Sequence, residues 1–265
     1  MNKVEKHYDR SAELEWNRLI KHRTEFAVTM KGLLDHLPSP PADLLDVGSG
    51  PGRYSIELAK NGYLISLVDL SQASLDLAKE KASEAGIEFT AEIQLDATNL
   101  SGISDESFDG VLLLGPLYHL ISEDQRKQAV LETKRVLKPG KLIFATFITR
   151  FAPFRNSACE QPEWVIKNND YAYELLDSGK HTEGKRFPNA YFAHPYEIQP
   201  FMEDCGFETI TIIGVEGIVA GHEDEVNKLQ GSEWDNWVDL NYKLGQDTSL
   251  YGASDHMLYI GKVSS

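Results

Sequence analysis

The sequence predicts an α/β fold in which a doubly wound, mostly parallel sheet carries helices on both faces. Residues 43–47 read as a buried strand that enters a turn with glycine at every second position. Residues 54–60 follow this turn with the apolar spacing of a helix. Strand-sized apolar segments then alternate with helical ones up to residue 148. Five strands with four intervening helices imply parallel pairing through crossover connections.

Two helices are expected before the first strand. Residues 1–22 form a polar helix with few apolar positions, and a second helix covers roughly Thr24–Leu37. It ends at Pro38-Ser39-Pro40-Pro41, because proline does not continue a helix. After the first strand, Ser71 is a plausible N-cap for the second crossover helix. The remaining strands are expected at residues 63–68, 87–95, 108–114 and 141–148, and the helices at 71–84 and 123–137.

The second half of the chain is less regular. Residues 150–193 are rich in aromatic residues, Asn and Pro, and we predict that they form an inserted cap. A helix from His194-Pro195 to about Asp204 and strands at 208–215 and 257–263 return the chain to the core. The expected organisation is therefore a core at 38–149, the cap at 150–193, and a C-terminal part of the core at 194–265 with a helical insertion at about 221–250.

Composition narrows the class of partner. The net charge is −15 and the basic residues are scattered among acids, which disfavours nucleic acid and favours a small molecule. No apolar run approaches the roughly 20 residues that span a bilayer, so no membrane span is expected. Cys159 and Cys205 have neither metal-ligand nor disulfide spacing; we expect two buried thiols, no metal site and a cytoplasmic location.

The glycine turn suggests which ligand the fold binds. Gly48-Ser49-Gly50-Pro51-Gly52 follows Asp46 in the pattern D-x-G-x-G-x-G, whereas a dinucleotide fingerprint starting at Gly48 would need glycine where Arg53 stands. The segment resembles the motif of class I S-adenosylmethionine (SAM)-dependent methyltransferases of the small-molecule type, such as methyltransferase type 11 and the ubiquinone-biosynthesis methyltransferases. The resemblance implies a seven-stranded sheet with the last strand antiparallel. It also implies that the acid lies near the ammonium group of the methionine moiety.

The resemblance extends over residues 43–148. Val68-Asp69-Leu70 ends the second strand, where an acid can accept both ribose hydroxyls. Leu95-Asp96-Ala97 ends the third strand, where the family's acid binds the adenine amino group. Residues 108–120 and 135–142 look like the family's fourth-strand and fifth-strand signatures. The cofactor-binding residues expected from this reasoning are Asp46, Gly48, Ser49, Gly50, Gly52, Asp69, Leu70, Asp96, Ala97, Leu114 and Gly115, with Tyr8 and Arg18 from the N-terminal segment.

The N-terminal segment resembles the family's lid. Tyr8-Asp9-Arg10 and residues 15–19 look like the element that folds over bound SAM, which assigns residues 1–37 to a helical lid. The methionine carboxylate needs a cation, for which arginine offers two parallel N–H donors. Arg18 and Arg53 are both candidates, and the sequence does not choose between them.

Methyl transfer needs alignment of the acceptor with the sulfonium more than it needs an acid or a base. Where the acceptor must lose a proton, His or Tyr near the methyl group is expected. The candidate catalytic residues are Tyr118, His119 and His194, while His256 reads as a satisfied histidine at a strand edge.

The sequence therefore predicts a SAM-dependent methyltransferase acting on a small-molecule acceptor, as a monomer or homodimer. An aromatic-rich cap favours a flat or apolar acceptor, or a cation held by aromatic faces. Two alternatives remain open: a SAM-binding protein without catalysis, and an NAD-dependent oxidoreductase.

Overall fold

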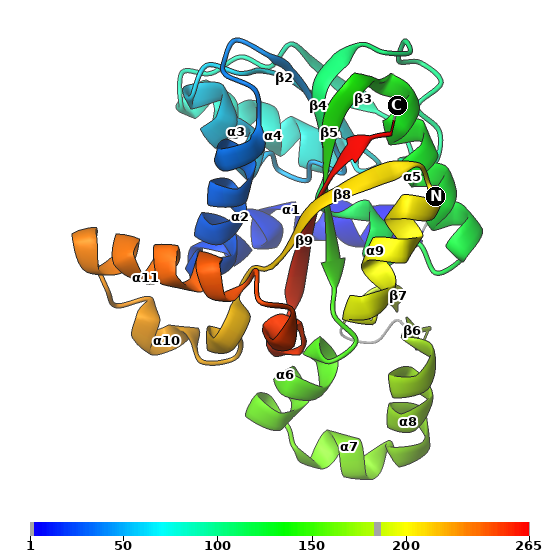
Figure 1. Cartoon of the computed structure of the whole chain (residues 1–265), viewed down its shortest axis with the longest axis vertical. Helices are drawn as coiled ribbons and strands as arrows, with labels where there is room; N and C mark the ends of the chain where they lie inside the picture. The colour runs from blue at the N-terminus through cyan, green and yellow to red at the C-terminus, as the bar shows by residue number, and fades with distance from the viewer. Residues whose placement is uncertain (1–2, 183–186, 265) are drawn as a thin grey trace.

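The computed structural model describes residues 3–182 and 187–264 (Figure 1). A central seven-stranded sheet has the order β3-β2-β1-β4-β5-β9-β8. The first five strands are parallel, and β9 runs antiparallel to both of its neighbours, so the expected fold class is confirmed. The strands are β1 (Asp43–Val47), β2 (Leu64–Asp69), β3 (Ala91–Gln94), β4 (Phe108–Leu113), β5 (Leu137–Ile148), β8 (Phe207–Gly214) and β9 (His256–Val263).

Helices cover both faces of the sheet. Leu33, Leu58 and Leu75 are fully or almost fully buried against one face, and Val130 and Met202 are buried against the other. Burying each such side chain contributes about 1.5–3 kcal/mol. The first face carries α2 (Arg23–His36), α3 (Arg53–Lys60), α4 (Gln72–Glu84) and α11 (Gly231–Leu244), and the second carries α5 (Glu123–Val136) and α9 (Pro195–Asp204).

One expected element is absent from the described residues. The sequence reading placed four helices between the first five strands, but the α-helices there are α3, α4 and α5, and residues 95–107 form an irregular connection. This connection is rich in Asp, Ser, Thr and Asn, whose side chains bond to nearby backbone groups instead of supporting a helix; Asp96 Oδ1, for example, accepts from the Thr98 N–H. β3 is also shorter than expected, because its ladder with β2 begins only at Ala91 and residues 87–90 precede it.

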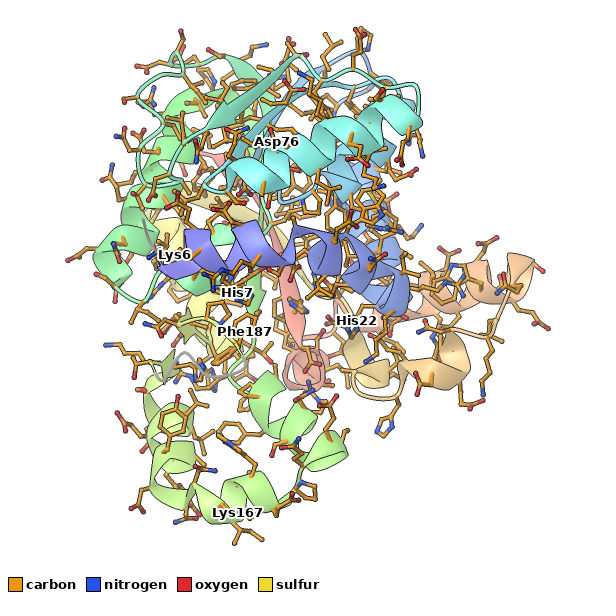
Figure 2. The ribbon with its side chains drawn as sticks, turned by 180° about the vertical axis from the view of Figure 1, so that it is seen from behind. Lys6, His7, His22, Asp76, Lys167 and Phe187 are labelled. Atoms are coloured by element: carbon orange, nitrogen blue, oxygen red, sulfur yellow. The ribbon has the colours of Figure 1, made fainter. Side chains whose placement is uncertain are left out.

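The loops that follow β1 to β4 gather at the carboxyl edge of the sheet. The first loop is tight: the Gly48 N–H donates to the Val68 carbonyl at 2.7 Å. A Cβ on Gly48 would lie 2.4 Å from Pro116 Cγ, so only glycine fits this approach. Helix α1 (Lys3–Lys21) crosses the same edge and packs beside α4, as Figure 2 shows from behind, with His7 on α1 and Asp76 on α4.

Residues 150–182 and 187–193 form a lobe beyond the sheet, whose three helices lie at the bottom of Figure 1. The lobe returns to the core where the Ala193 N–H donates to the Ile148 carbonyl at 2.8 Å. Its elements are α6 (Ala152–Glu160), α7 (Glu163–Lys167), α8 (Asn169–Ser178), β6 (Lys180–His181) and β7 (Ala190–Tyr191). The later insertion contains α10 (Glu223–Val226), α11 and the 3-10 helix η3 (Thr248–Ala253).

The two cysteines differ in environment. Cys205 is buried as expected, but Cys159 is exposed on α6, so the expectation of a second buried thiol was wrong. Cys159 lies in the last turn of α6, where the flanking Ala158 and Glu160 are exposed as well. Among the described helices, none combines the length and apolarity that crossing a membrane requires.

Candidate functional site

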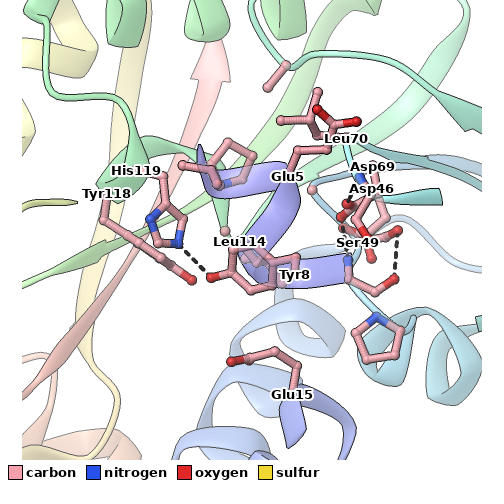
Figure 3. A pocket seen from close by; sticks show the side chains of 18 of the residues that line it. Glu5, Tyr8, Glu15, Asp46, Ser49, Asp69, Leu70, Leu114, Tyr118 and His119 are labelled. Atoms are coloured by element: carbon pink, nitrogen blue, oxygen red, sulfur yellow. Dashed lines mark hydrogen bonds between the residues drawn. The ribbon is translucent and has the colours of Figure 1, made fainter. Parts of the chain in front are cut away.

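A cavity of about 170 Å³ lies at the carboxyl edge of the sheet, between the loops after β1 to β4 and helix α1. Figure 3 shows α1 crossing it, with Asp46 and Asp69 on one side of Tyr8 and His119 on the other. We call it the first cavity. Every residue expected to bind the cofactor lines it except Gly52: Tyr8, Arg18, Asp46, Gly48, Ser49, Gly50, Asp69, Leu70, Asp96, Ala97, Leu114 and Gly115.

Asp69 is held in place by the backbone around it. Its Oδ2 accepts from the Gly50 N–H at 2.7 Å and its Oδ1 from the Ser71 N–H at 2.8 Å. These bonds join the glycine loop to the end of β2 and fix the carboxylate at the wall of the first cavity. Burial raises the pKa of Asp69, although the backbone N–H donors oppose that shift.

Asp46 has an unsatisfied oxygen. Its Oδ2 accepts from Ser55 Oγ at 2.7 Å, but its Oδ1 is buried and has no partner among the described residues. Burial raises the pKa of Asp46 to about 7, and the neighbouring charge of Asp69 adds to the shift. A buried acceptor without a donor costs free energy, so this carboxyl is suited to a cationic ligand group such as an ammonium.

The glycine turn leaves room for a ligand at one position. Gly50 has φ +53, and a Cβ built there would meet nothing within 4 Å, so the loop borders open space. Gly52 has a different role: it lies before α3, and a Cβ there would lie 3.1 Å from Ala78 Cβ. Gly52 therefore permits α3 to pack near α4, and it does not line the cavity.

The two candidate arginines, Arg18 and Arg53, differ in the partners that their guanidinium groups already have. Arg18 donates twice to the buried Glu25, at 2.6 and 2.8 Å, and once to Glu15 at 3.2 Å. Arg53 donates to the Trp16 carbonyl at 3.1 Å and lies over the rings of Trp16 and Phe26, but its buried Nε has no hydrogen-bond partner among the described residues. Of the two, Arg53 is the cation with donor capacity and charge left for a ligand carboxylate.

The far side of the first cavity carries a tyrosine–histidine pair. Tyr8 Oη lies 2.6 Å from His119 Nε2, and His119 Nδ1 lies 3.4 Å from the Asn189 carbonyl oxygen. Burial lowers the pKa of His119 to about 4, so the imidazole is neutral at physiological pH. Burial also raises the pKa of both Tyr8 and Tyr118, so both phenols are protonated.

A second cavity of about 680 Å³ opens between α1, the start of β9 and the lobe of residues 150–193. It shares four wall residues with the first cavity: Tyr8, Glu15, Arg18 and Tyr118. Its aromatic and apolar wall includes Trp164, Phe187 and Phe192, and its polar wall includes Arg18, Asp255 and His256. The two cavities therefore meet at the residues that they share.

Comparison with known proteins agrees with this geometry. Residues 44–140 match the model of a family described as a methyltransferase domain. The ubiquinone biosynthesis O-methyltransferase of Coxiella burnetii is 29% identical over 173 residues, which cover 65% of this chain and 66% of that protein. The segment of residues 44–140 is a methyltransferase domain.

Solved structures of methyltransferases have the same fold. A SAM-dependent methyltransferase from Methanosarcina mazei superposes with a TM-score of 0.58 at 19% identity, covering 88% of this chain and 96% of the other. The 1,6-didemethyltoxoflavin N1-methyltransferase of Burkholderia thailandensis superposes with a TM-score of 0.61 at 13% identity, covering 99% and 88%. The latter structure holds its acceptor and S-adenosylhomocysteine.

The described residues of the first cavity fit SAM. The molecule carries an ammonium, a carboxylate and ribose hydroxyls. The first cavity presents an Asp46 oxygen and an Arg53 Nε that have no hydrogen-bond partner among the described residues, together with the fixed Asp69 carboxylate. The open space beside Gly50 supplies the bare backbone against which the ligand can lie.

His194 lies away from both cavities. It is the N-cap of α9, where its Nδ1 accepts from the Tyr196 N–H at 3.4 Å and Glu197 completes a capping box. The side chain therefore stabilises a helix start, and we do not place it among residues that act on a substrate.

His256 is the first residue of β9 and its Nδ1 has a hydrogen-bond partner, as expected, but it also belongs to a network of buried charges that was not expected. It lies at the wall of the second cavity, bonded through Nδ1 to the buried Glu216 and 3.9 Å from Glu25. Burial opposes its protonation, but the charges of Glu25 and Glu216 outweigh burial and raise its pKa to about 9. The carboxylate oxygens of Glu25 and Glu216 and a ring nitrogen of His256 lie within 4.8 Å of one another, as the ligands of a metal site would. However, Glu25 already accepts two hydrogen bonds from Arg18, and Glu216 is already bonded to the imidazolium of His256.

The sequence carried no signal for this network of charges. Arg18 and Glu25 come from α1 and α2, and Glu216 and His256 come from segments far later in the chain. Neighbouring sequence gives no spacing that pairs them. The same holds for the second-cavity residues His22, His181 and Asp255, which no sequence motif contains.

Proposed function

We propose that this methyltransferase transfers the methyl group of SAM to a small molecule that occupies the second cavity. One observation carries the proposal: the cavity that fits SAM and a larger cavity behind it meet at Tyr8, Glu15, Arg18 and Tyr118. An acceptor in the second cavity would approach the cofactor at this junction. Holding the two reactants in line supplies a large part of the catalysis of methyl transfer.

The proposed cofactor contacts follow the charges of the first cavity. Asp46 Oδ1 would accept from the ammonium, Arg53 would donate to the carboxylate, and Asp69 would accept from the ribose hydroxyls. Asp96 and Ala97, after β3, would contact the adenine, as the family resemblance implies. When bound, SAM supplies the activated methyl group and a positive charge that is lost on transfer.

The chain's own residues would exclude water and orient the acceptor. Helix α1 closes the edge of the first cavity through Tyr8, and we propose that it acts as the lid. The lobe of residues 150–193 would act as a cap whose Trp164, Phe187 and Phe192 bury an apolar or flat acceptor. Excluding water strengthens the polar contacts within such a site.

The acceptor atom is proposed to be a hydroxyl oxygen. The support is that the curated relatives are named as O-methyltransferases, although the matched segment spans about two thirds of their length. A cytoplasmic location and a monomeric or homodimeric state remain predictions.

Calorimetry with S-adenosylhomocysteine and a methylation screen of phenols and catechols test the proposal. We expect one binding site per chain and a methyl ether product detected by mass spectrometry. A chain that binds neither SAM nor S-adenosylhomocysteine would contradict it. Tight binding without product from any class of acceptor would favour the alternative of a SAM-binding protein without catalysis.

A further inference from the structure

The imidazole of His119 is the point where three separate parts of the fold meet. Tyr8 reaches it from α1, Tyr118 precedes it in the turn after β4, and Phe187 and Asn189 approach it from the lobe. Its two ring nitrogens contact different parts: Nε2 faces Tyr8 Oη at 2.6 Å, and Nδ1 faces the Asn189 carbonyl at 3.4 Å.

These contacts define the protonation state of the ring. A carbonyl oxygen only accepts, so Nδ1 carries the hydrogen and donates it to Asn189. Nε2 then has a free lone pair and accepts from the Tyr8 hydroxyl. Tyr8 has two lone pairs of its own left to accept a hydrogen bond, and it lines both cavities.

We infer that Tyr8 and His119 together take the proton from the acceptor hydroxyl during methyl transfer. The inference rests on the proposed function. The acceptor O–H would donate to Tyr8 Oη while the Tyr8 proton passes to His119 Nε2. The O–CH₃ bond forms as the S–CH₃ bond breaks with its electron pair left on sulfur, and the products are the methyl ether, S-adenosylhomocysteine and an imidazolium on His119.

The charge balance of the site favours this route. The step removes one positive charge at sulfur and creates one at His119, so the net charge in the buried region is unchanged. Burial lowers the pKa of His119, and a bound sulfonium would lower it further. The loss of the positive charge on sulfur therefore raises the pKa of His119 as the methyl group leaves.

Aromatic rings surround the imidazole where the charge would form. The ring of Phe187 is stacked on His119 with 5.4 Å between centroids, and the rings of Tyr8 and Tyr118 meet it edge-on at 5.4 and 4.7 Å. A cation over the face of an aromatic ring is stabilised by the ring's π electrons, and the stacked Phe187 offers such a face to His119. The nearby titratable groups are His7 on α1 and the two tyrosines, and a charge on His7 would oppose protonation.

A tautomer measurement tests the inference without turnover. In ¹⁵N-histidine NMR of the S-adenosylhomocysteine complex, with His119→Gln used to assign the signals, we expect the neutral Nδ1–H form of His119. A neutral Nε2–H form would overturn the inference, because Nε2 would then have no lone pair for a proton. This readout stands apart from the proposed function, which fails if the complex does not form at all.

Kinetics with paired acceptors provide the second test. Tyr8→Phe and His119→Gln should lower kcat for catechol by about 100-fold or more, with the catechol KM little changed. Both losses should shrink to a few-fold for 4-nitrocatechol, which is already ionised at the assay pH. Equal losses on the two acceptors would overturn the inference and leave the pair a structural contact.

A matched control separates the pair from general effects of removing a buried hydroxyl. Tyr63 donates its hydroxyl to the Pro38 carbonyl at 3.0 Å, away from both cavities. Tyr63→Phe should leave kcat for both acceptors within a few-fold of the parent. Should neither catechol be methylated, the tautomer measurement decides the inference.

Discussion

At the scale of single residues, the carboxylates of Asp46 and Asp69 differ in their hydrogen-bond partners. Asp69 has both oxygens bonded to backbone N–H groups, whereas Asp46 keeps one buried oxygen with no partner. Asp69 is therefore preorganised as an acceptor for neutral hydroxyls. Asp46 has a stronger need for a charged donor, because a buried oxygen without a bond carries a desolvation cost.

Removing the Asp69 carboxylate should weaken cofactor binding. We expect Asp69→Ala to cost about 1.5–3 kcal/mol in the free energy of S-adenosylhomocysteine binding, from the loss of charge-assisted bonds to the ribose. Titration calorimetry measures the change. Because Asp69 also ties the glycine loop to β2, the melting temperature must be checked, and Asp69→Asn serves as the milder variant. An unchanged Kd in a folded Asp69→Ala variant would remove Asp69 from the site.

Cofactor affinity should depend on pH through Asp46. Its pKa of about 7 means that the free acid is protonated below neutrality and must lose that proton to bind an ammonium. Affinity for S-adenosylhomocysteine should therefore rise as pH rises from 5.5 to 7, by about tenfold. The measurement is the Kd across this range.

The control for this dependence is Asp46→Asn. The amide does not titrate, so most of the dependence should disappear and the affinity at pH 7 should fall. Burial also raises the pKa of Asp69, which leaves a smaller trend of the same sign. A parent protein whose affinity is flat from pH 5.5 to 7 would argue against an Asp46–ammonium contact.

At the scale of elements, α1 packs beside α4 and also makes several polar contacts at the site. Asp9 accepts from Ser71 Oγ at 2.6 Å, Tyr8 contacts His119, and the Trp16 carbonyl accepts from Arg53. Each of these contacts adjoins residues that line the first cavity. Ligand binding and the position of α1 should therefore be coupled.

Hydrogen exchange tests that coupling. Amide exchange in residues 8–20 should slow when S-adenosylhomocysteine binds, because the ligand adds contacts beneath α1. Amides of β1 should change little by comparison, since they are already buried in the sheet. Identical exchange in residues 8–20 with and without ligand would make α1 a packing helix and not a lid.

A truncation that tests the lid must keep Arg18. Deleting residues 1–20 would leave Glu25 buried without its cation, and breaking such a pair costs about 3–5 kcal/mol. Deleting residues 1–14 removes Tyr8 and Asp9 but retains Arg18. We expect this shorter deletion to lower turnover far more than it lowers the melting temperature.

At the scale of the whole molecule, the parts predicted from sequence are those specified locally. The glycine motif, Asp69 and Asp96 were found because each lies at the end of a strand that neighbouring residues define. Contacts between distant segments were not found: Tyr8 and His119 are 111 positions apart, and their pairing depends on how α1 crosses the sheet. His194 shows the converse, since a His-Pro helix start looks the same in sequence whether its ring caps the helix or faces a substrate.

The charge network around His256 has a consequence for stability. Its pKa is raised from the ordinary 6.5 to about 9 because Glu25 and Glu216 outweigh the effect of burial. A group whose pKa is raised on folding stabilises the fold fully below its unfolded pKa, and this contribution is lost as pH rises through the folded value. The protein should therefore lose up to about 3 kcal/mol of stability between pH 6.5 and 9.5.

Urea denaturation at the two pH values checks this, with His256→Gln as the comparison. The variant should be less stable than the parent at pH 6.5, and the gap between them should narrow at pH 9.5. A gap that stays constant would mean that the charge of His256 does not contribute to folding. Glu25 contributes at acidic pH instead. Because its pKa is lowered from 4.5 to about 2 on folding, its ionised carboxylate stabilises the fold above pH 4.5, and this contribution is lost as the pH falls toward 2.

The central claim is that the two cavities hold the two reactants and meet at the point of transfer. A crystal structure with S-adenosylhomocysteine tests it most directly. The account predicts the thioether sulfur at the junction of Tyr8, Glu15, Arg18 and Tyr118, with the ligand carboxylate on Arg53 and its ammonium on Asp46. A ligand bound elsewhere, or a sulfur that faces away from the second cavity, would contradict it.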